Sequence, residues 1–213
     1  MIFASYADFR TKVQILIDGD DISQSDLSVT TLDLIISAGE ERLYRDIRSS
    51  TQDTAYSLVT AGNLVALPTD CIELKGAPYV TGYMVATYTP WEAIQNLIQL
   101  ETAFSNYYGN DNHAVRYSFQ SDNIIFFPVQ NDGVTVTGQY YKRFPDLSTG
   151  LNALFTRHPD VFLYAALAES APFLGEVARL KIWEGKYQEL VESANETERR
   201  RYTRGGKLQT RIA

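Results

Sequence analysis

The sequence has a single cysteine, Cys71, and no long apolar run. One thiol cannot form an internal disulfide framework, so the chain is not a small disulfide-rich secreted domain, and it suits a reducing cytoplasm. No apolar segment approaches the roughly 20 residues that a membrane-spanning helix needs. The start, MIFASYADFR, reaches a charged residue within eight positions, unlike a secretory leader. We therefore expect neither a membrane segment nor a signal peptide.

The sequence also lacks the motifs of common catalytic and cofactor sites. The patterns GxxxxGK[ST], GxGxxG, GxSxG and HExxH are all missing. The two histidines, His113 and His158, lie in different segments, and their neighbours do not have the spacing of a zinc site or a Cys–His nucleophile. His158 precedes Pro159, which is typical of a residue at the start of a helix. We expect no metal, no cofactor and no enzymatic activity.

Clustered carboxylates are present, but their spacing does not favour a site. Asp18, Asp20 and Asp21 resemble the beginning of a calcium-binding loop, yet Ile22 and Val29 stand where further ligands are required. We interpret this stretch as a solvated loop before a helix. Adjacent acids could suggest a glycosidase, but neighbours in sequence point in different directions, and no apolar pocket frames them.

Charge is distributed unevenly along the chain. There are 19 basic and 26 acidic residues, and the last 15 residues contain six of the basic ones and no acid. The remainder therefore has 13 basic and 26 acidic residues. Such asymmetry is typical of an interaction tail. Its six basic residues are Arg199, Arg200, Arg201, Arg204, Lys207 and Arg211.

The basic tail is compatible with two kinds of partner. Clustered cations can bind nucleic acid by releasing counterions, but the acidic remainder of the chain would repel DNA. An acidic protein partner accounts for the same residues without this conflict. We expect Arg199–Arg201 to extend the final helix and residues 203–213, with Gly205–Gly206, to form a flexible arm.

Hydrophobic periodicity predicts helices near both ends of the chain and strands between them. Helical spacing is found in residues 5–18, 30–49, 90–100, 158–174 and 176–201, and β-type patterns in 54–60, 64–68, 71–80, 83–88, 114–119, 123–128 and 133–144. Ser5 and Asp8 resemble a capping box, and Gly62–Asn63 predicts a hairpin. Pro172 should kink or end its helix.

Several residues are expected in the helical core. Leu43 and Ile47 should pack with Leu180 and Trp183, and Gly39 predicts a close contact between helices.

Charged residues of the same helix are expected to face solvent. Glu40, Glu41, Arg45 and Arg48 lie opposite its apolar stripe, and Glu41 and Arg45 have the spacing of a surface ion pair.

The 14 tyrosines allow two interpretations. Tyrosine is enriched at protein interfaces, and it also fills half-buried strand faces.

These patterns indicate an α+β protein in which both chain ends form a helical bundle domain. A β-rich insertion interrupts the helices, and a basic flexible C-terminal arm follows them. The expected divisions are residues 1–52 and 148–202 for the helical domain, 53–147 for the insertion and 203–213 for the arm.

The order of these segments resembles the head-to-tail adaptor (connector) proteins of tailed bacteriophages. The resemblance covers nearly the whole chain and depends on several phrases taken together. They are DFRTKVQILID, LDLIISAGEERLYRDIR, NLVALPTDCIELKG, NIIFFP, VTVTGQYYKRFPDLS and LFTRHPDVFLYAALAESAPFLGEVARLKIWEGKYQEL.

The resemblance implies a structural virion protein at the neck, or tail vertex, assembled in the host cytoplasm. It implies a homo-oligomeric ring, a dodecamer, that joins the portal protein to the tail or nozzle and forms part of the DNA channel. Genomic DNA would pass through without sequence-specific binding. The C-terminal arm would bind the portal through Arg199, Arg200, Arg201, Tyr202, Arg204, Lys207, Leu208 and Arg211.

Two other functions remain open at this stage. One is a tail-associated peptidoglycan hydrolase, which would need a carboxylate pair in a pocket. The other is a nucleic-acid-binding assembly factor that uses the basic tail.

Overall fold

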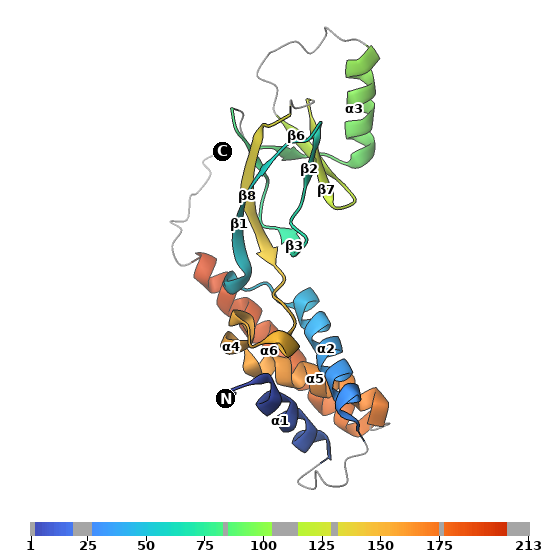
Figure 1. The fold of residues 1–213 in the computed structure, drawn as a ribbon, viewed down its shortest axis with the longest axis vertical. Helices are drawn as coiled ribbons and strands as arrows, with labels where there is room; N and C mark the ends of the chain where they lie inside the picture. Colours follow the sequence, from blue (N-terminus) through green and yellow to red (C-terminus); the bar gives the residue numbers. More distant parts are fainter. Residues whose placement is uncertain are drawn as a thin grey trace, which may run out of the picture. The chain divides into compact units, whose positions relative to one another are not determined.

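The fold is mixed α+β and divides into two compact units (Figure 1). The computed structural model describes residues 3–18, 27–82, 85–103, 115–128, 132–174 and 177–203. A helical unit comprises the described residues of Met1–Gln52 and Arg143–Ala213, and a β unit comprises those of Asp53–Lys142. The expectations for Asp20, Asp21, Ile22 and His113 and for the arm beyond Thr203 lie outside the described residues.

The helical unit contains five α-helices and two short 3₁₀ helices in its described part. They are α1 (Tyr6–Asp18), α2 (Val29–Asp46), η2 (Ser50–Gln52), η3 (Leu147–Thr149), α4 (Ala153–Arg157), α5 (Pro159–Leu174) and α6 (Val177–Thr203). The expected cap of α1 is present: Asp8 N–H donates to Ser5 Oγ at 3.2 Å, and the Asp8 carboxylate accepts from Ala4 N–H. Ser28 and Asn152 cap α2 and α4 in the same way.

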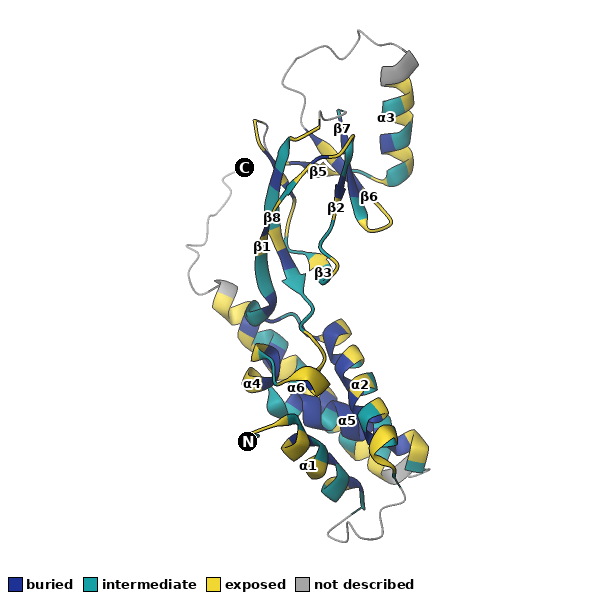
Figure 2. Ribbon diagram, viewed as in Figure 1, coloured by how far each residue is buried: buried dark blue, intermediate teal, exposed yellow. Residues whose placement is uncertain are grey.

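Helix α5 lies at the centre of this unit, in contact with α1, α2, α4 and α6. Its sequence is apolar nearly all round, and most of its residues are buried, which is typical of a helix enclosed by others (Figure 2). The run of alanines allows its neighbours to approach closely. Pro172 lies inside α5, and the helix ends two residues later at Leu174.

At Gly39, α2 approaches the backbone of α5 closely, as the position of this glycine in the sequence predicted. A Cβ atom built on Gly39 would lie 2.8 Å from the backbone nitrogen of Ala166 and 2.9 Å from the carbonyl carbon of Ala165. These are backbone atoms of a central helix, so they cannot move aside without shifting α5. Gly39 is therefore required for the α2–α5 contact.

The prediction that Glu40 and Glu41 face solvent was wrong for Glu40, which is 3% exposed. Its carboxylate accepts a hydrogen bond from Leu147 N–H at 3.1 Å and a longer one from the Tyr44 hydroxyl at 3.5 Å. Glu41 pairs with Arg143 rather than with Arg45. The two glutamates hold the segment Arg143–Leu147, which follows the last strand, against α2.

A second polar network joins α2 to α5 and α6. The Arg42 guanidinium donates to Glu169 at 3.2 Å and also to Glu184, and it lies 4.4 Å from the centre of the Tyr187 ring. The hydrogen bond from Arg42 lowers the pKa of Glu184. Tyr187 donates its hydroxyl proton to Asp46 at 2.7 Å. Charged residues of α2 thus connect three helices.

The predicted core was correct on α2 and wrong on α6. Leu43 and Ile47 are fully buried, but Leu180 and Trp183 are only partly buried. Among the described side chains of α6, the buried ones begin at Tyr187 and continue with Ala194 and Glu198. Neighbouring helices cover the apolar stripe of α6 from Tyr187 onward, so Trp183 is not the main anchor.

The β unit contains eight strands and one helix in its described part. They are β1 (Asp53–Val59), β2 (Leu64–Ala66), β3 (Cys71–Leu74), β4 (Tyr79–Val80), β5 (Thr87–Tyr88), α3 (Trp91–Ala103), β6 (Arg116–Gln120), β7 (Asn123–Phe127) and β8 (Thr135–Lys142). One sheet has the order β1-β8-β3, with β4 also paired to β8. The other has the order β2-β7-β6-β5.

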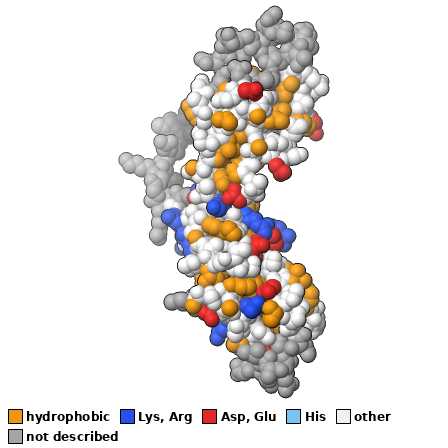
Figure 3. Space-filling model, viewed as in Figure 1, with side chains coloured by type: hydrophobic (Ala, Val, Ile, Leu, Met, Phe, Trp, Pro, Cys, Tyr) orange, Lys and Arg blue, Asp and Glu red, His pale blue; other side chains and the backbone are white. Residues whose placement is uncertain are grey.

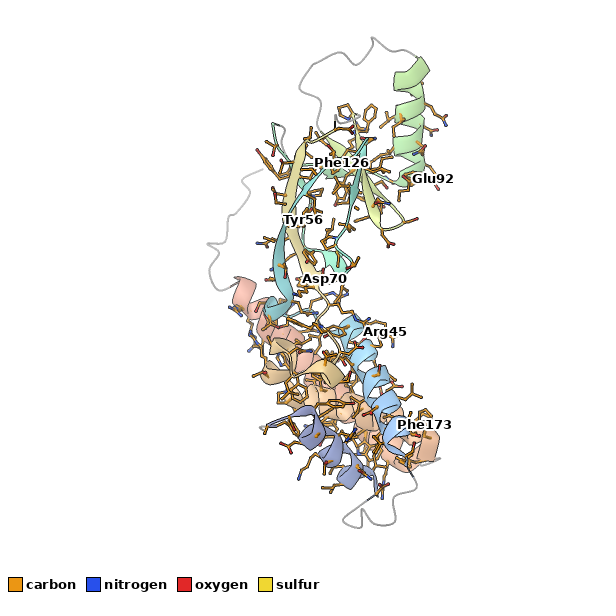
Figure 4. The ribbon with its side chains drawn as sticks, viewed as in Figure 1. Arg45, Tyr56, Asp70, Glu92, Phe126 and Phe173 are labelled. Atoms are coloured by element: carbon orange, nitrogen blue, oxygen red, sulfur yellow. The ribbon has the colours of Figure 1, made fainter. Side chains whose placement is uncertain are left out.

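The core of the β unit lies between the two sheets. Tyr56 and Tyr140 of the first sheet form one buried cluster with Ile124 and Phe126 of the second, and Figure 4 labels Tyr56 and Phe126. The alternate β7 residues, Ile125 and Phe127, face the other side and pack with Ile94 of α3. Strand β7 is therefore covered on both faces, which accounts for its uninterrupted apolar run.

The predicted turn at Gly62–Asn63 exists, but it does not join a hairpin. Gly62 has φ +61°, and Ala61 bridges to Leu64 across the turn. Strand β1 nevertheless pairs with β8, and β2 pairs with β7. The turn therefore transfers the chain from one sheet to the other.

The tyrosines divide between the two interpretations. Tyr56, Tyr117 and Tyr140 are buried in the β unit, whereas Tyr79 and Tyr88 are 44% and 56% exposed. Tyr56 lies across Gly138 of β8, where an added Cβ would be 2.5 Å from the tyrosine hydroxyl. Tyrosines of the described strands thus serve both roles: three are buried in the core, and others remain partly or largely on the surface.

We expect Gly39→Ala to destabilise the protein by about 1–3 kcal/mol, because the added methyl group must displace the α5 backbone. The control is Gly185→Ala in α6, where an added Cβ meets nothing within 4 Å. That change should stabilise by about 0.5–1 kcal/mol through helix propensity. Urea unfolding measures the free energy of unfolding of both variants. Equal changes of the same sign would contradict the close contact at Gly39.

We expect the stability contributed by Glu40 to fall as pH rises. Burial raises its pKa from 4.5 to about 7. Between pH 4.5 and about pH 7, the folded protein therefore binds a proton at Glu40 that the unfolded chain does not. The stability that Glu40 contributes is complete below pH 4.5 and is lost as the pH rises through about 7. The neutral substitution Glu40→Gln should remove this pH dependence of the free energy of unfolding, which is worth up to about 3 kcal/mol.

The measurement is the free energy of unfolding of both proteins from about pH 4 to about pH 8, a range that brackets this titration. Subtracting the variant's free energy of unfolding from that of the wild type at each pH cancels the contributions of the other carboxylates. Parallel curves for wild type and variant would show that Glu40 does not titrate in this range.

Candidate functional site

The candidate site is an arginine cluster at the C-terminal end of α6, consisting of Arg157, Arg199, Arg200 and Arg201. Figure 3 shows basic side chains in blue beside the end of this helix. Arg200 and Arg201 lie in the last turn of α6, where cations interact favourably with the partial negative charge of the helix terminus. Arg157 comes from α4.

Glu198 fixes the interior of this cluster. Its side chain is 3% exposed, and it forms an ion pair with Arg157 at 2.7 Å. Its carboxylate also accepts hydrogen bonds from Ser49 Oγ at 3.3 Å and Ser50 N–H at 3.1 Å. A buried carboxylate is stable only with such partners, so Glu198 ties α4 and the start of η2 to α6.

Ser50 connects two of the arginines. Its hydroxyl oxygen accepts a hydrogen bond from Arg157 at 3.3 Å and another from Arg201. Arg157 and Arg201, which are distant in sequence, therefore meet at one oxygen atom.

The outer arginines are paired with an acid on the helix surface. Arg200 donates to Glu196 at 2.9 Å, and Arg199 contacts the same carboxylate at 2.7 Å. The side chains of Arg199 and Arg200 are 75% and 66% exposed. Such exposed pairs contribute little to stability, so these arginines can exchange partners at low cost.

A pocket of about 430 Å³ opens within the cluster. Its described lining residues are Arg157, Thr197, Arg200 and Arg201. Four arginines and the acids Glu196 and Glu198 leave the cluster with a net charge of +2. The arrangement is suited to binding an anion.

The expected tail residues are placed only in part. The side chains of Arg199, Arg200 and Arg201 lie in the cluster, and Tyr202 continues the backbone of α6. The positions Arg204, Lys207, Leu208 and Arg211 lie outside the described residues. Sequence reasoning missed Arg157, because it is far from the tail in sequence and stands alone.

His158 has the structural position that the sequence predicted. Its N–H donates to Leu154 O at the end of α4, and its carbonyl accepts from Phe162 N–H at the start of α5. Burial and the neighbouring Arg157 lower the pKa of the imidazole. Within the described part of the chain, no group of three or more His, Cys, Asp or Glu side chains is arranged to hold a metal ion.

A second cavity, of about 480 Å³, lies in the β unit. Cys71, Phe119, Glu73 and Asp122 are among its lining residues. Burial raises the pKa of the Cys71 thiol.

None of the described helices is long and apolar enough to cross a membrane.

Residues 4–210 match the protein family described as SU10 adaptor protein. The chain belongs to this family. The match covers nearly the whole chain and agrees with its resemblance to head-to-tail adaptors of tailed phages. A comparison with curated proteins found no match.

Proposed function

We propose that this SU10-family protein is a structural virion component that joins the portal of a tailed bacteriophage to its tail or nozzle. The observation that carries the proposal is the family match over residues 4–210. In this account the protein is assembled in the host cytoplasm and remains at the neck of the virion. Several copies form a closed ring, a dodecamer, around the channel through which DNA passes.

Exposed apolar side chains support the assembly of a ring. In the helical unit, Leu34, Phe173 and Ile182 are 60%, 58% and 69% exposed. In the β unit, Val59 and Tyr88 are 61% and 56% exposed. Burying these side chains against neighbouring copies in a ring would contribute favourable hydrophobic free energy to assembly.

The charge of the chain supports a channel role. Outside the last 15 residues, acids outnumber basic residues by 26 to 13. A wall with this excess of negative charge repels DNA phosphates and lets the genome move without adhering.

The C-terminal end supports attachment to the portal. The exposed arginines at the end of α6 and the basic residues of the arm (residues 203–213) form one continuous basic segment in the sequence. In this proposal the helical domain (residues 1–52 and 148–202) carries the arm to the portal. The insertion, expected at residues 53–147, forms the β lobe, and its compact unit ends at Lys142.

We expect the triple variant Arg204→Gln, Lys207→Gln, Arg211→Gln to weaken capture by the portal protein at physiological salt. The loss should be about tenfold or more, because three cations of the docking segment are removed. Surface plasmon resonance on immobilised portal measures the affinity.

The matched control removes the same charge elsewhere. Lys12, Arg45 and Lys181 are exposed residues of α1, α2 and α6, and their triple change to Gln should leave affinity within about twofold. Unchanged capture by the arm variant would reject the arm as the docking element. Loss of DNA binding instead of portal binding would favour the nucleic-acid-binding assembly factor.

A further inference from the structure

We propose that the pocket in the arginine cluster binds a carboxylate side chain from an acidic segment of the partner protein. This inference rests on the proposed function, in which that partner is the portal. It adds Arg157 and Thr197 to the binding surface and makes a built pocket, rather than the arm alone, the point of recognition.

The first argument is convergence. Arg157 of α4 and Thr197, Arg200 and Arg201 of α6 line one pocket of about 430 Å³. A guanidinium presents a planar fork of N–H donors that matches the two oxygens of a carboxylate. Arg157, Arg200 and Arg201 therefore offer several bidentate arrangements around a single acid.

The second argument is preorganisation of the inner arginine. Arg157 is held by the buried Glu198 at 2.7 Å and by Ser50 at 3.3 Å. These contacts use two of its five N–H donors. Because the side chain is already ordered, binding an acid there loses little conformational entropy.

The third argument is the weak pairing of the outer arginines. Arg200 shares Glu196 with Arg199 on the exposed surface of α6. The Arg200–Glu196 ion pair is exposed, so an incoming carboxylate can replace Glu196 as the partner of Arg200 at low cost. The pocket thus combines a fixed inner arginine with an outer one that can turn toward the ligand.

Charge favours a protein carboxylate over a DNA phosphate chain. The cluster has a net charge of only +2 because Glu196 and Glu198 lie within it. Affinity for DNA depends on neutralising many phosphates at once, and an acidic protein body opposes that. A single acid in a pocket needs only the two or three guanidinium groups that are present.

The test uses the full-length protein and a fluorescein-labelled hexaglutamate peptide, with binding measured by fluorescence anisotropy at physiological salt. The double variant Arg200→Gln, Arg201→Gln should weaken binding at least about tenfold. Arg157→Lys keeps the charge but loses the fork, and it should weaken binding about threefold or more. The control Lys12→Gln, Arg45→Gln removes two charges outside the pocket and should change binding less than about twofold.

Two results of the peptide assay would overturn the inference. One is equal weakening by the pocket and control variants, which would show only long-range attraction. The other is tighter, Arg157-dependent binding of a short DNA duplex, which would make the pocket a phosphate site. Urea midpoints of the variants confirm folding, and Arg200→Gln, Arg201→Gln keeps the test valid if Arg157→Lys is unstable.

The portal capture assay separates the two proposals. If capture requires the arm but the double variant Arg200→Gln, Arg201→Gln captures portal normally, the proposed function stands and the pocket is not the recognition site. If the protein binds the peptide through the pocket but does not capture portal, the carboxylate site stands and the proposed function is rejected.

Discussion

Two buried carboxylates hold the segments through which the helical unit continues into the rest of the chain. Glu40 accepts the backbone N–H of Leu147, and Glu198 accepts that of Ser50. Both side chains are almost fully buried, so each would be costly to bury without these partners. The outgoing segment at Ser50 and the returning segment at Leu147 are thereby fixed to α6 and α2. Because Glu198 also positions Arg157, the same interaction builds the candidate binding pocket.

The close helix packing depends on a different constraint, which is space. Gly39 allows α2 to touch the backbone of α5 at Ala165 and Ala166. That approach places Arg42 within reach of Glu169 on α5 and Glu184 on α6. Small residues at the contact and charged residues beside it therefore act together to join three helices.

Much of the secondary structure could be predicted from the sequence, because it depends on local patterns. The caps at Ser5 and Asp8, the apolar stripe of α2 and the apolar run of β7 all depend on residues close together in the chain. The role of Gly39 was also predictable, because a glycine inside an apolar helical stripe lowers helix propensity and is favoured there mainly by close packing.

The errors arose where a distant partner decides the outcome. Glu40 was expected on the surface because charged residues on a helix usually are, and only Leu147 and Tyr44 make its burial possible. The turn at Gly62–Asn63 was identified, but the strands on either side of it pair with β8 and β7, which come much later in the chain. Arg157 was missed for the same reason, since nothing near it in sequence indicates that α6 ends beside it.

The central proposal is that this member of the SU10 adaptor family assembles as a ring on the portal. That assembly would give a role to the arginine cluster, the exposed apolar side chains and the acidic body alike. The most direct measurement is the mass of the complex formed when the chain is co-expressed with portal. The account predicts a closed ring, and a dodecamer of the 24.0 kDa chain would add about 288 kDa to the portal. A portal complex that gains no mass, or only that of a single copy, would contradict it.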